Sequence, residues 1–377
     1  MEKEIIYVDK VYYSEKENVE IKNAKDIKSL VREIQTVSDY LRAITMILSN
    51  YLILDERDLE IKCFENVFSL KPKRLKEAVD RIYFRGQSKE YEFVIPGIYR
   101  NIEYLKNEKK MIEEAELSYP KELRKIETQT DKLALMQHYG LPTRILDITT
   151  NALIALYFAV SDFEKEDGIV YLFDNRDKKK SNSKSNSVVV KVAVAKLLYE
   201  DKILLNELFS KEENKELSIQ EYLETKVRNE IKTVIEKVCE NIQSDIGFIP
   251  KTIKISDFYG IDFVHPIEME ERIIRQSGTF MVFGLDGLEN NVTEESIQNK
   301  IDEMIHKYEI RYSPENGILI DKKFRFNKSM GEARIKIKKE YKNQLKNELE
   351  MIGIIKKIVY PDMQNKSLYI KEKYEND

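Results

Sequence analysis

The stretch that decides the fold reads QHYGLPTRILDITTNALIALYFA and runs from Gln137 to Ala159. Its first half gathers aromatic, hydroxyl, guanidinium and carboxylate side chains around a Gly-Leu-Pro turn, a density that packing alone does not explain. Its second half is apolar at helical spacing. We therefore expect a short strand over residues 143–147, then a helix over residues 151–163 that packs against a sheet, with a polar ligand bound beside the turn.

Three residues around the turn are candidates for contact with this ligand. Tyr139 offers an aromatic ring and Thr143 a hydroxyl group, and they flank the Gly-Leu-Pro turn. His138 either contacts the ligand as well or, when protonated, complements the dipole at the end of the preceding helix. Tyr139 and Thr143 are better placed to contact the ligand than the charged residues Arg144 and Asp147 that follow.

The charged residues of the expected strand could have structural roles instead of contacting the ligand. Arg144 and Asp147 are three residues apart, so they point to opposite faces and at most one of them lines a given pocket. Asp147 takes part in chemistry or caps the helix that follows. Thr149 or Thr150 is an equally suitable N-cap for that helix.

Composition limits the classes of function. The 377 residues include 63 Lys and Arg against 67 Asp and Glu, so the net charge of −4 gives no overall field that would select nucleic acid or an anionic membrane. Cys63 and Cys239 lie far apart with no His at ligand spacing, and the three histidines share no such spacing, so we predict no metal site and no disulfide. The Lys-rich stretches KPKRLK and KIKKEYKNQLK indicate solvated helix faces, which leaves nucleic-acid binding open but not favoured.

The sequence shows no signal for a membrane. The amino terminus MEKEIIYVDK has no apolar signal-peptide core, and no window approaches the roughly 20 apolar residues that span a bilayer. We expect a cytoplasmic protein with no membrane partner, and we leave its oligomeric state, including a homo-oligomer, open.

The remaining pattern predicts an α+β fold with a mixed or antiparallel sheet flanked by helices, because strands and helices do not alternate regularly. Predicted helices cover 24–50, 120–139, 195–240, 294–308 and 339–354, and predicted strands cover 82–84, 168–173, 188–194, 261–266, 272–284, 317–320, 324–326 and 355–363. The strands at 168–173 and 188–194 are expected to form a hairpin. Arg85 is expected at a strand end, before a turn of Gly86 and Gln87.

Two further segments suggest an anion or nucleotide site. Arg85 carries the planar fork that best matches a phosphate, and Gly86 would let a ligand approach the backbone, although Arg85 could also be a structural ion-pair partner. On a regular strand, Arg272 and Gln276 would share one face with Gly278. That face would form a pocket wall, or the solvated side of an edge strand.

Together these residues resemble the FRG domain family, named for its aromatic-Arg-Gly motif. The matching blocks are Phe84-Arg85-Gly86-Gln87, IPGIYR at 95–100, QHYGLPTRILD at 137–147, NALIALYFA at 151–159, RIIRQSGTF at 272–280 and GIIKKIVYPDM at 353–363. The resemblance covers residues 75–375, after an N-terminal helical segment at 1–74 and with an insertion at 174–245. The family usually has Trp where this chain has Ile148. FRG domains are prokaryotic and phage-associated modules, which implies a toxin or antiviral defence context.

The layout is also similar to that of ADP-ribosyltransferase-like folds, with Arg on an early strand, an aromatic-Thr segment before a helix, and a polar residue on a late strand. This likeness implies an NAD-dependent ADP-ribosyltransferase or NAD glycohydrolase. Arg85 would hold the pyrophosphate or ribose, Tyr139 would stack on nicotinamide, and Thr143 would orient the ribose. Gln276 would take the activating position, with Glu271 or Glu270 nearby because Gln cannot act as a base. The further ligand-binding candidates are Phe84, Gly86, Gln87, His138, Arg144, Asp147 and Arg272.

The alternative hypothesis is a non-catalytic sensor. In this case the same pocket binds a nucleotide or a phage-derived ligand, and the helical insertion relays the signal. Binding needs only anion and aromatic contacts and no general base. A missing catalytic carboxylate would therefore favour this alternative. The sequence identifies neither the macromolecular target nor the trigger.

Overall fold

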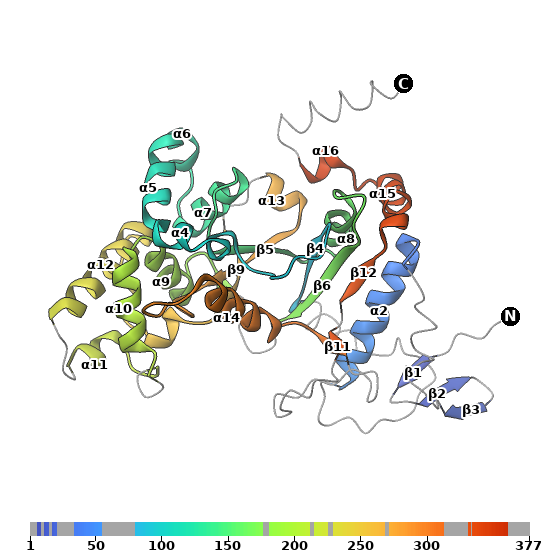
Figure 1. Ribbon diagram of the computed structural model, residues 1–377, viewed down its shortest axis with the longest axis horizontal. Coiled ribbons are helices and arrows are strands. Elements are labelled where there is room, and N and C mark those ends of the chain that lie inside the picture. Colours follow the sequence, from blue (N-terminus) through green and yellow to red (C-terminus); the bar gives the residue numbers. More distant parts are fainter. Residues whose placement is uncertain are drawn as a thin grey trace. The chain divides into compact units, whose positions relative to one another are not determined.

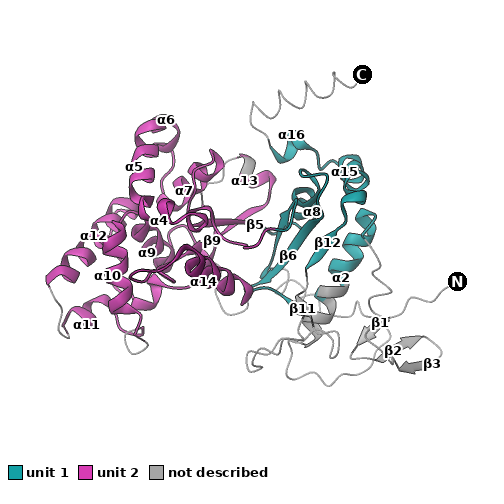
Figure 2. Ribbon diagram, in the orientation of Figure 1, with its two compact units in different colours: residues 1–90, 149–176, 308–377 teal, residues 91–148, 177–307 magenta. Residues whose placement is uncertain are grey.

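The computed structural model in Figure 1 describes residues 6–8, 11–14, 17–20, 34–54, 80–175, 181–211, 215–224, 229–267, 271–312, 331–332 and 334–360. The chain divides into two compact units, which Figure 2 colours separately. Unit 1 comprises residues 1–90, 149–176 and 308–377, and unit 2 comprises residues 91–148 and 177–307.

The largest sheet has seven strands in the order β12-β6-β4-β5-β9-β8-β7. The strands are β4 Ile82–Gln87, β5 Ile145–Thr149, β6 Gly168–Asp174, β7 Ser181–Asn182, β8 Ile261–His265, β9 Gly278–Phe283 and β12 Ile335–Ile337. The pairs β12–β6, β6–β4, β4–β5 and β8–β9 are antiparallel, whereas β7 and β8 are parallel. The predicted α+β class with a mixed sheet is therefore confirmed.

Unit 1 is organised around helix α8, Ala152–Val160, which packs on β4 and β6. Two glycines allow this close approach. A Cβ on Gly86 would lie 1.8 Å from the carbonyl oxygen of Ala155, and a Cβ on Gly168 would lie 2.1 Å from that of Ala159. Gly86 is therefore required for packing, because any side chain there would collide with the backbone of α8.

Unit 1 contains several further described elements. They are helices α2 Val37–Leu54, α15 Lys342–Met351 and α16 Lys356–Val359, the 3-10 helix η5 Lys339–Tyr341, and the short strands β1 Ile6–Val8, β2 Val11–Ser14, β3 Glu17–Glu20, β10 Arg311–Tyr312 and β11 Gly331–Glu332. Helix α15 contacts both α8 and α2, and the phenol of Tyr40 on α2 donates a hydrogen bond to the Ala152 carbonyl at 2.7 Å. The segment predicted to be helical at 1–74 thus holds one described helix and three short strands.

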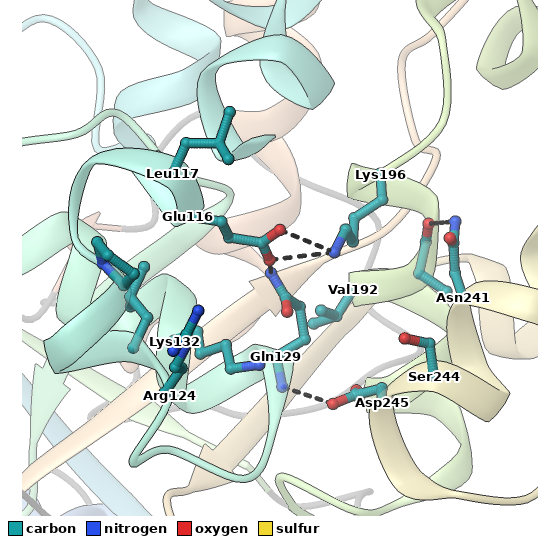
Figure 3. Close-up of a pocket in the computed structure, with 13 residues that line it drawn as sticks. Glu116, Leu117, Arg124, Gln129, Lys132, Val192, Lys196, Asn241, Ser244 and Asp245 are labelled. Atoms are coloured by element: carbon teal, nitrogen blue, oxygen red, sulfur yellow. Dashed lines mark hydrogen bonds and ion pairs between the residues drawn. The ribbon is translucent and has the colours of Figure 1, made fainter. Parts of the chain in front are cut away.

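Unit 2 is mostly helical. Its helices are α4 Ile102–Lys106, α5 Glu108–Ser118, α6 Pro120–Leu123, α7 Gln129–His138, α9 Asn186–Ala195, α10 Tyr199–Phe209, α11 Ile219–Glu224, α12 Asn229–Ile246, α13 Glu271–Arg275 and α14 Glu294–His306, with 3-10 helices η2 Gly97–Arg100 and η4 Ile255–Phe258. Side chains of α7, α9, β8 and β9 share one hydrophobic core. Helices α5, α6, α7, α9 and α12 also line the cavity shown in Figure 3.

The strand predicted at 188–194 was wrong. The valine-rich stretch at 188–194 forms the helix α9 rather than the second strand of a hairpin. Every residue from Val188 to Ala195 is buried, including Lys191. β-branched residues favour strands only weakly, so burial around the whole helix overrides their preference.

Three further expectations need correction. Residues 271–275 form α13, and β9 begins only at Gly278, so Arg272 and Gln276 do not share a strand face with Gly278. Residues 356–359 are helical instead of extended. Arg85, Gly86 and Gln87 continue β4 instead of turning after it. The strands predicted at 317–320 and 324–326 lie outside the described residues.

Several local signals were correct. Helix α7 ends before Gly140, whose φ of +91° is the left-handed conformation that glycine adopts at a helix end. The region after Ala195 is helical in α10, α11 and α12. The N-cap of α8, however, is Asn151 and neither a neighbouring Thr nor Asp147, because its Oδ1 accepts the N–H of Leu153 at 2.9 Å. In the described part of the chain, no helix combines the length and the apolar character needed for a membrane span.

Candidate functional site

The Phe-Arg-Gly-Gln motif lies within β4, where successive side chains point to opposite faces. Phe84 and Gly86 face α8 and the hydrophobic core of unit 1. Arg85 and Gln87 point to the other face, and the register of β4 with β6 pairs Arg85 with Tyr171 and Gln87 with Ile169. We call the surface formed by Arg85, Gln87 and Tyr171 the Arg85 face.

Tyr171 interacts with the charged side chains at the Arg85 face. Burial raises its pKa above the ordinary tyrosine value, with Arg334 and Arg85 opposing the shift and Glu309 supporting it. The Arg334 guanidinium lies 5.1 Å from the centre of the Tyr171 ring and binds Glu309, with Nε 2.7 Å from Oε1 and Nη2 3.2 Å from Oε2. The phenol therefore stays protonated at neutral pH, and Glu309 compensates the charge of Arg334.

Gln87 adds a buried amide to the same face. Its side chain is 6% exposed, and its Oε1 has no hydrogen-bond partner within the described residues. A buried acceptor without a partner is costly and calls for a donor. A ligand with an anionic group for Arg85 and a hydroxyl or amino group for Gln87 would satisfy both side chains, and a nucleotide carries both.

In unit 2, the aromatic part of the QHYGLPTR block lies at the surface. Tyr139, the residue after α7, is 55% exposed. Its ring stacks on that of Tyr119 with centroids 5.5 Å apart and on that of His138 with centroids 5.3 Å apart. These three rings form an aromatic stack in which Tyr119 and Tyr139 are exposed.

Thr143 has a structural position in the same block. It is 2% exposed, and its hydroxyl donates to the Gln137 side chain at 2.5 Å and accepts the N–H of Ile145 at 3.3 Å. Its carbonyl accepts the N–H of Ile98 at 3.1 Å, so the IPGIYR and QHYGLPTR blocks are joined within unit 2. The predicted ribose contact of Thr143 stays a prediction, and the hydrogen bonds observed here organise the turn.

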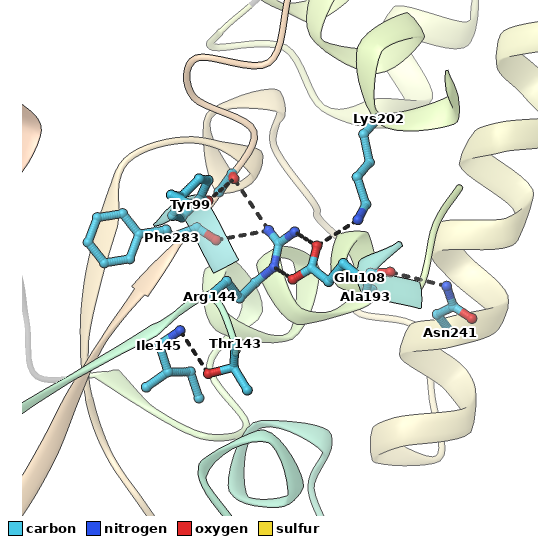
Figure 4. Close-up of polar contacts among 10 residues, drawn as sticks. Tyr99, Glu108, Thr143, Arg144, Ile145, Ala193, Lys202, Asn241 and Phe283 are labelled. Atoms are coloured by element: carbon cyan, nitrogen blue, oxygen red, sulfur yellow. Dashed lines mark hydrogen bonds and ion pairs between the residues drawn. The ribbon is translucent and has the colours of Figure 1, made fainter. Parts of the chain in front are cut away.

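Arg144 is the centre of a buried ion network, shown in Figure 4. It is 0% exposed; its Nε donates to Oε1 of Glu108 at 2.8 Å and its Nη2 to Oε2. Its Nη1 donates to the carbonyl of Phe283 at 3.1 Å, and Nζ of Lys202 binds Oε2 of Glu108 at 2.6 Å. The guanidinium is fully engaged, so this geometry does not favour the predicted ligand contact of Arg144.

The network connects the QHYGLPTR block to the helical block, by which we mean helices α9 to α12. Glu108 begins α5, and Lys202 belongs to α10. Burial lowers the pKa of Lys202 to about 8, with Glu108 opposing the shift. Burial acts to raise the pKa of Glu108, but Arg144 and Lys202 together hold it below its usual value. Sequence reasoning missed both partners, because in a highly charged chain a single Glu and a single Lys carry no distinguishing pattern.

Residues 80–168 match the FRG domain family. The chain carries an FRG domain. The match includes the blocks at 84–87, 95–100, 137–147 and 151–159, and it ends before those at 272–280 and 353–363. Neither curated proteins nor solved structures gave a match.

The FRG domain runs through both units. Residues 80–90 and 149–168 belong to unit 1, and residues 91–148 belong to unit 2. The helices α9 to α12 lie in unit 2 with the middle of the domain, and α9 contributes Val188, Val192 and Ala195 to its core. Within unit 2, this helical block is therefore packed into the structure rather than added as a separate layer.

The remaining predicted site residues lie in unit 2. Asp147 is the exposed residue of β5. Glu271 is exposed on α13 and forms an ion pair with Arg275 at 3.4 Å. Gln276 is partly buried in the turn between α13 and β9, and Arg272 is on α13, with its side chain outside the described structure. The described residues contain no group of three or more His, Cys, Asp or Glu side chains arranged to hold a metal ion.

Proposed function

We propose that the FRG domain binds NAD through Arg85 and acts as an ADP-ribosyltransferase-like effector in a toxin or anti-phage defence system. The observation that supports this proposal is the Arg85 face, where a guanidinium, a protonated phenol and a buried amide oxygen lie together on paired strands. These groups complement a phosphate and a sugar hydroxyl.

Arg85 has the chemistry that a pyrophosphate requires. The planar guanidinium offers several donors in a fixed fork, which matches phosphate oxygens better than the single ammonium of Lys. Tyr171 adds a hydroxyl donor, and Gln87 accepts a hydrogen bond from a ribose hydroxyl or an adenine amino group. Gly86 makes no ligand contact in this proposal, since its space is taken by α8.

ADP-ribosyl transfer would break the N-glycosidic bond of NAD and release nicotinamide. The ADP-ribosyl carbon would then form a bond to a nucleophile of the target or to water, with loss of the nucleophile's proton. Within unit 2, the stack of Tyr119, Tyr139 and His138 offers a planar surface to an aromatic ring. Glu271 is the carboxylate that we propose as acceptor of the proton.

The sensor alternative is favoured by a specific observation. The Glu271 carboxylate pairs with Arg275, and Gln276, which cannot accept a proton as a base, lies in a turn instead of on a strand. A domain that binds NAD or another nucleotide without consuming it needs neither group. In that case the helical block would relay the signal that a nucleotide is bound.

A single experiment separates these alternatives. The purified 377-residue chain is incubated with NAD labelled on the adenine side, with and without cell lysate, and nicotinamide release and label transfer are followed. Calorimetry measures NAD binding in parallel. We expect Arg85→Ala to abolish binding and release, whereas Arg42→Ala, which changes an exposed arginine of the same unit, leaves both unchanged.

The outcomes differ clearly. Release or transfer that disappears in Arg85→Ala supports the enzyme. Saturable NAD binding without release supports the sensor. Equal NAD affinity of Arg85→Ala and the parent protein would overturn the role of the Arg85 face in both.

A further inference from the structure

Unit 2 contains a cavity of about 470 Å³, shown in Figure 3. One wall comes from α5, α6 and α7 of the FRG domain, and the other from α9 and α12 of the helical block. No lining residue belongs to unit 1, so the cavity is distinct from the Arg85 face. Its volume is in the range of small-molecule sites, roughly 300–1,000 Å³.

The cavity combines an apolar lining with charged groups. Leu123, Val192 and Ala193 contribute apolar side chains that are at most 4% exposed. Nζ of Lys196 binds Oε1 of Glu116 at 3.1 Å, and Nε2 of Gln129 donates to the same oxygen at 3.0 Å. The charges of Lys196 and Glu116 therefore compensate each other, and neither is left to pair with a ligand.

Two other cations of the lining differ from Lys196. Arg124 and Lys132 both line the cavity, and within the described structure neither side chain forms an ion pair or a hydrogen bond. The lining thus holds three cations, Arg124, Lys132 and Lys196, against two carboxylates, Glu116 and Asp245, a net charge of +1. An anion would find its complement at Arg124 and Lys132.

Asp245 sets a second requirement for the ligand. Its Oδ1 accepts the N–H of Gln129, the first residue of α7, at 2.6 Å. The carboxylate of Asp245 thus complements the positive dipole at the amino end of that helix. Its Oδ2 accepts no hydrogen bond from any described residue. Burial raises the pKa of Asp245, with the Gln129 N–H and Lys132 opposing the shift. A hydrogen-bond donor of the ligand would satisfy this carboxylate.

We propose that this cavity is a second ligand site and takes a small phosphomonoester, a nucleoside monophosphate in size and chemistry. Its phosphate binds Arg124 and Lys132, its apolar body lies against Leu123 and Val192, and a hydroxyl or amino group donates to Asp245. Because the two walls come from the FRG domain and the helical block, the bound ligand also stabilises their packing.

The test is calorimetric titration of the 377-residue chain with the four ribonucleoside 5′-monophosphates and with inorganic phosphate. We expect saturable binding of at least one nucleotide, weaker binding of phosphate alone, and at least about a tenfold loss of affinity in Arg124→Glu/Lys132→Glu, which is about 1.4 kcal/mol. Lys125→Glu, an exposed neighbour that does not line the cavity, is the matched control and keeps full affinity.

Further variants keep the test decisive. If the double variant does not fold, as judged by circular dichroism, Ser244→Leu fills the cavity from α12 and is expected to lower the affinity in its place. Arg85→Ala retains monophosphate binding, which separates this site from the proposed NAD site. The proposal is overturned if no probe binds saturably, if the cavity variants bind like the parent, or if Arg85→Ala alone removes binding.

Discussion

Gly86 packs against the backbone of Ala155, because a Cβ at Gly86 would lie 1.8 Å from the Ala155 carbonyl oxygen. Gly168 has the same relationship to Ala159, one helical turn further along α8, at 2.1 Å. In both cases the obstacle is main chain, which cannot rotate away as a side chain can. The close packing of α8 on the sheet thus explains why the FRG motif has glycine at position 86.

Gly86→Ala is therefore expected to be strongly destabilising. Relief of the clash requires α8 to move away from β4, which loses contacts across the core of unit 1, and we expect a cost of about 3 kcal/mol or more. The free energy of unfolding is measured by urea titration followed by circular dichroism.

Gly247→Ala is the control for Gly86→Ala. Gly247 has a φ of +81°, but a Cβ added there would meet no atom within 4 Å, so this change reports backbone strain alone. We expect it to cost about 1 kcal/mol. Equal costs for the two substitutions would contradict the packing role of Gly86.

Arg144→Met is expected to destabilise the protein by about 3–5 kcal/mol, because it leaves Glu108 buried with Lys202 as its remaining cation. Arg275→Met serves as the comparison, since it removes an exposed ion pair with Glu271 and is expected to change stability by no more than about 0.5 kcal/mol. Urea unfolding of both variants measures the difference. A cost for Arg144→Met as small as that for Arg275→Met would mean that the buried network contributes no stability.

The free energy of unfolding is expected to rise with pH above about pH 8. Burial lowers the pKa of Lys202 from 10.5 to about 8, so between these values the unfolded chain holds a proton that the folded chain has released. The slope from this site is at most about 1.4 kcal/mol per pH unit. Buried tyrosines with raised pKa act in the opposite direction from about pH 10, where unfolded tyrosines ionise.

The measurement for this pH dependence compares the parent with Lys202→Met at several pH values from about 7 to about 9.5. The parent should gain stability relative to the variant across this window. Parallel curves for the two proteins would show that Lys202 does not titrate there.

Sequence patterns predicted those parts of the fold that depend on local signals. The ends of α7 and α15 were indicated by Gly140 and Gly353, which have φ of +91° and +88°. Helix α9 was not predicted, because its valines favour a strand and only burial on all sides by distant segments makes the helix stable. Tertiary contacts of this kind leave no trace in local periodicity.

The candidate site was predicted as segments but not as a set of contacts. The FRGQ motif predicted an anion site at Arg85, which stays a prediction, and it did not indicate the neighbouring Tyr171 and Arg334, which lie far along the chain. Gly86 was interpreted as space for a ligand, since sequence does not reveal that α8 fills this space. Residues far apart in sequence meet only through the register of the sheet.

Glu271→Gln tests the chemistry of the proposed transfer. If Glu271 accepts the proton, kcat for nicotinamide release falls about 100-fold or more while the NAD dissociation constant stays within about twofold, because binding depends on Arg85. Glu295→Gln changes an exposed glutamate of the same unit and should retain full turnover. Turnover of Glu271→Gln equal to that of the parent would remove Glu271 from the mechanism. A parent protein that binds NAD without releasing nicotinamide would instead establish the sensor.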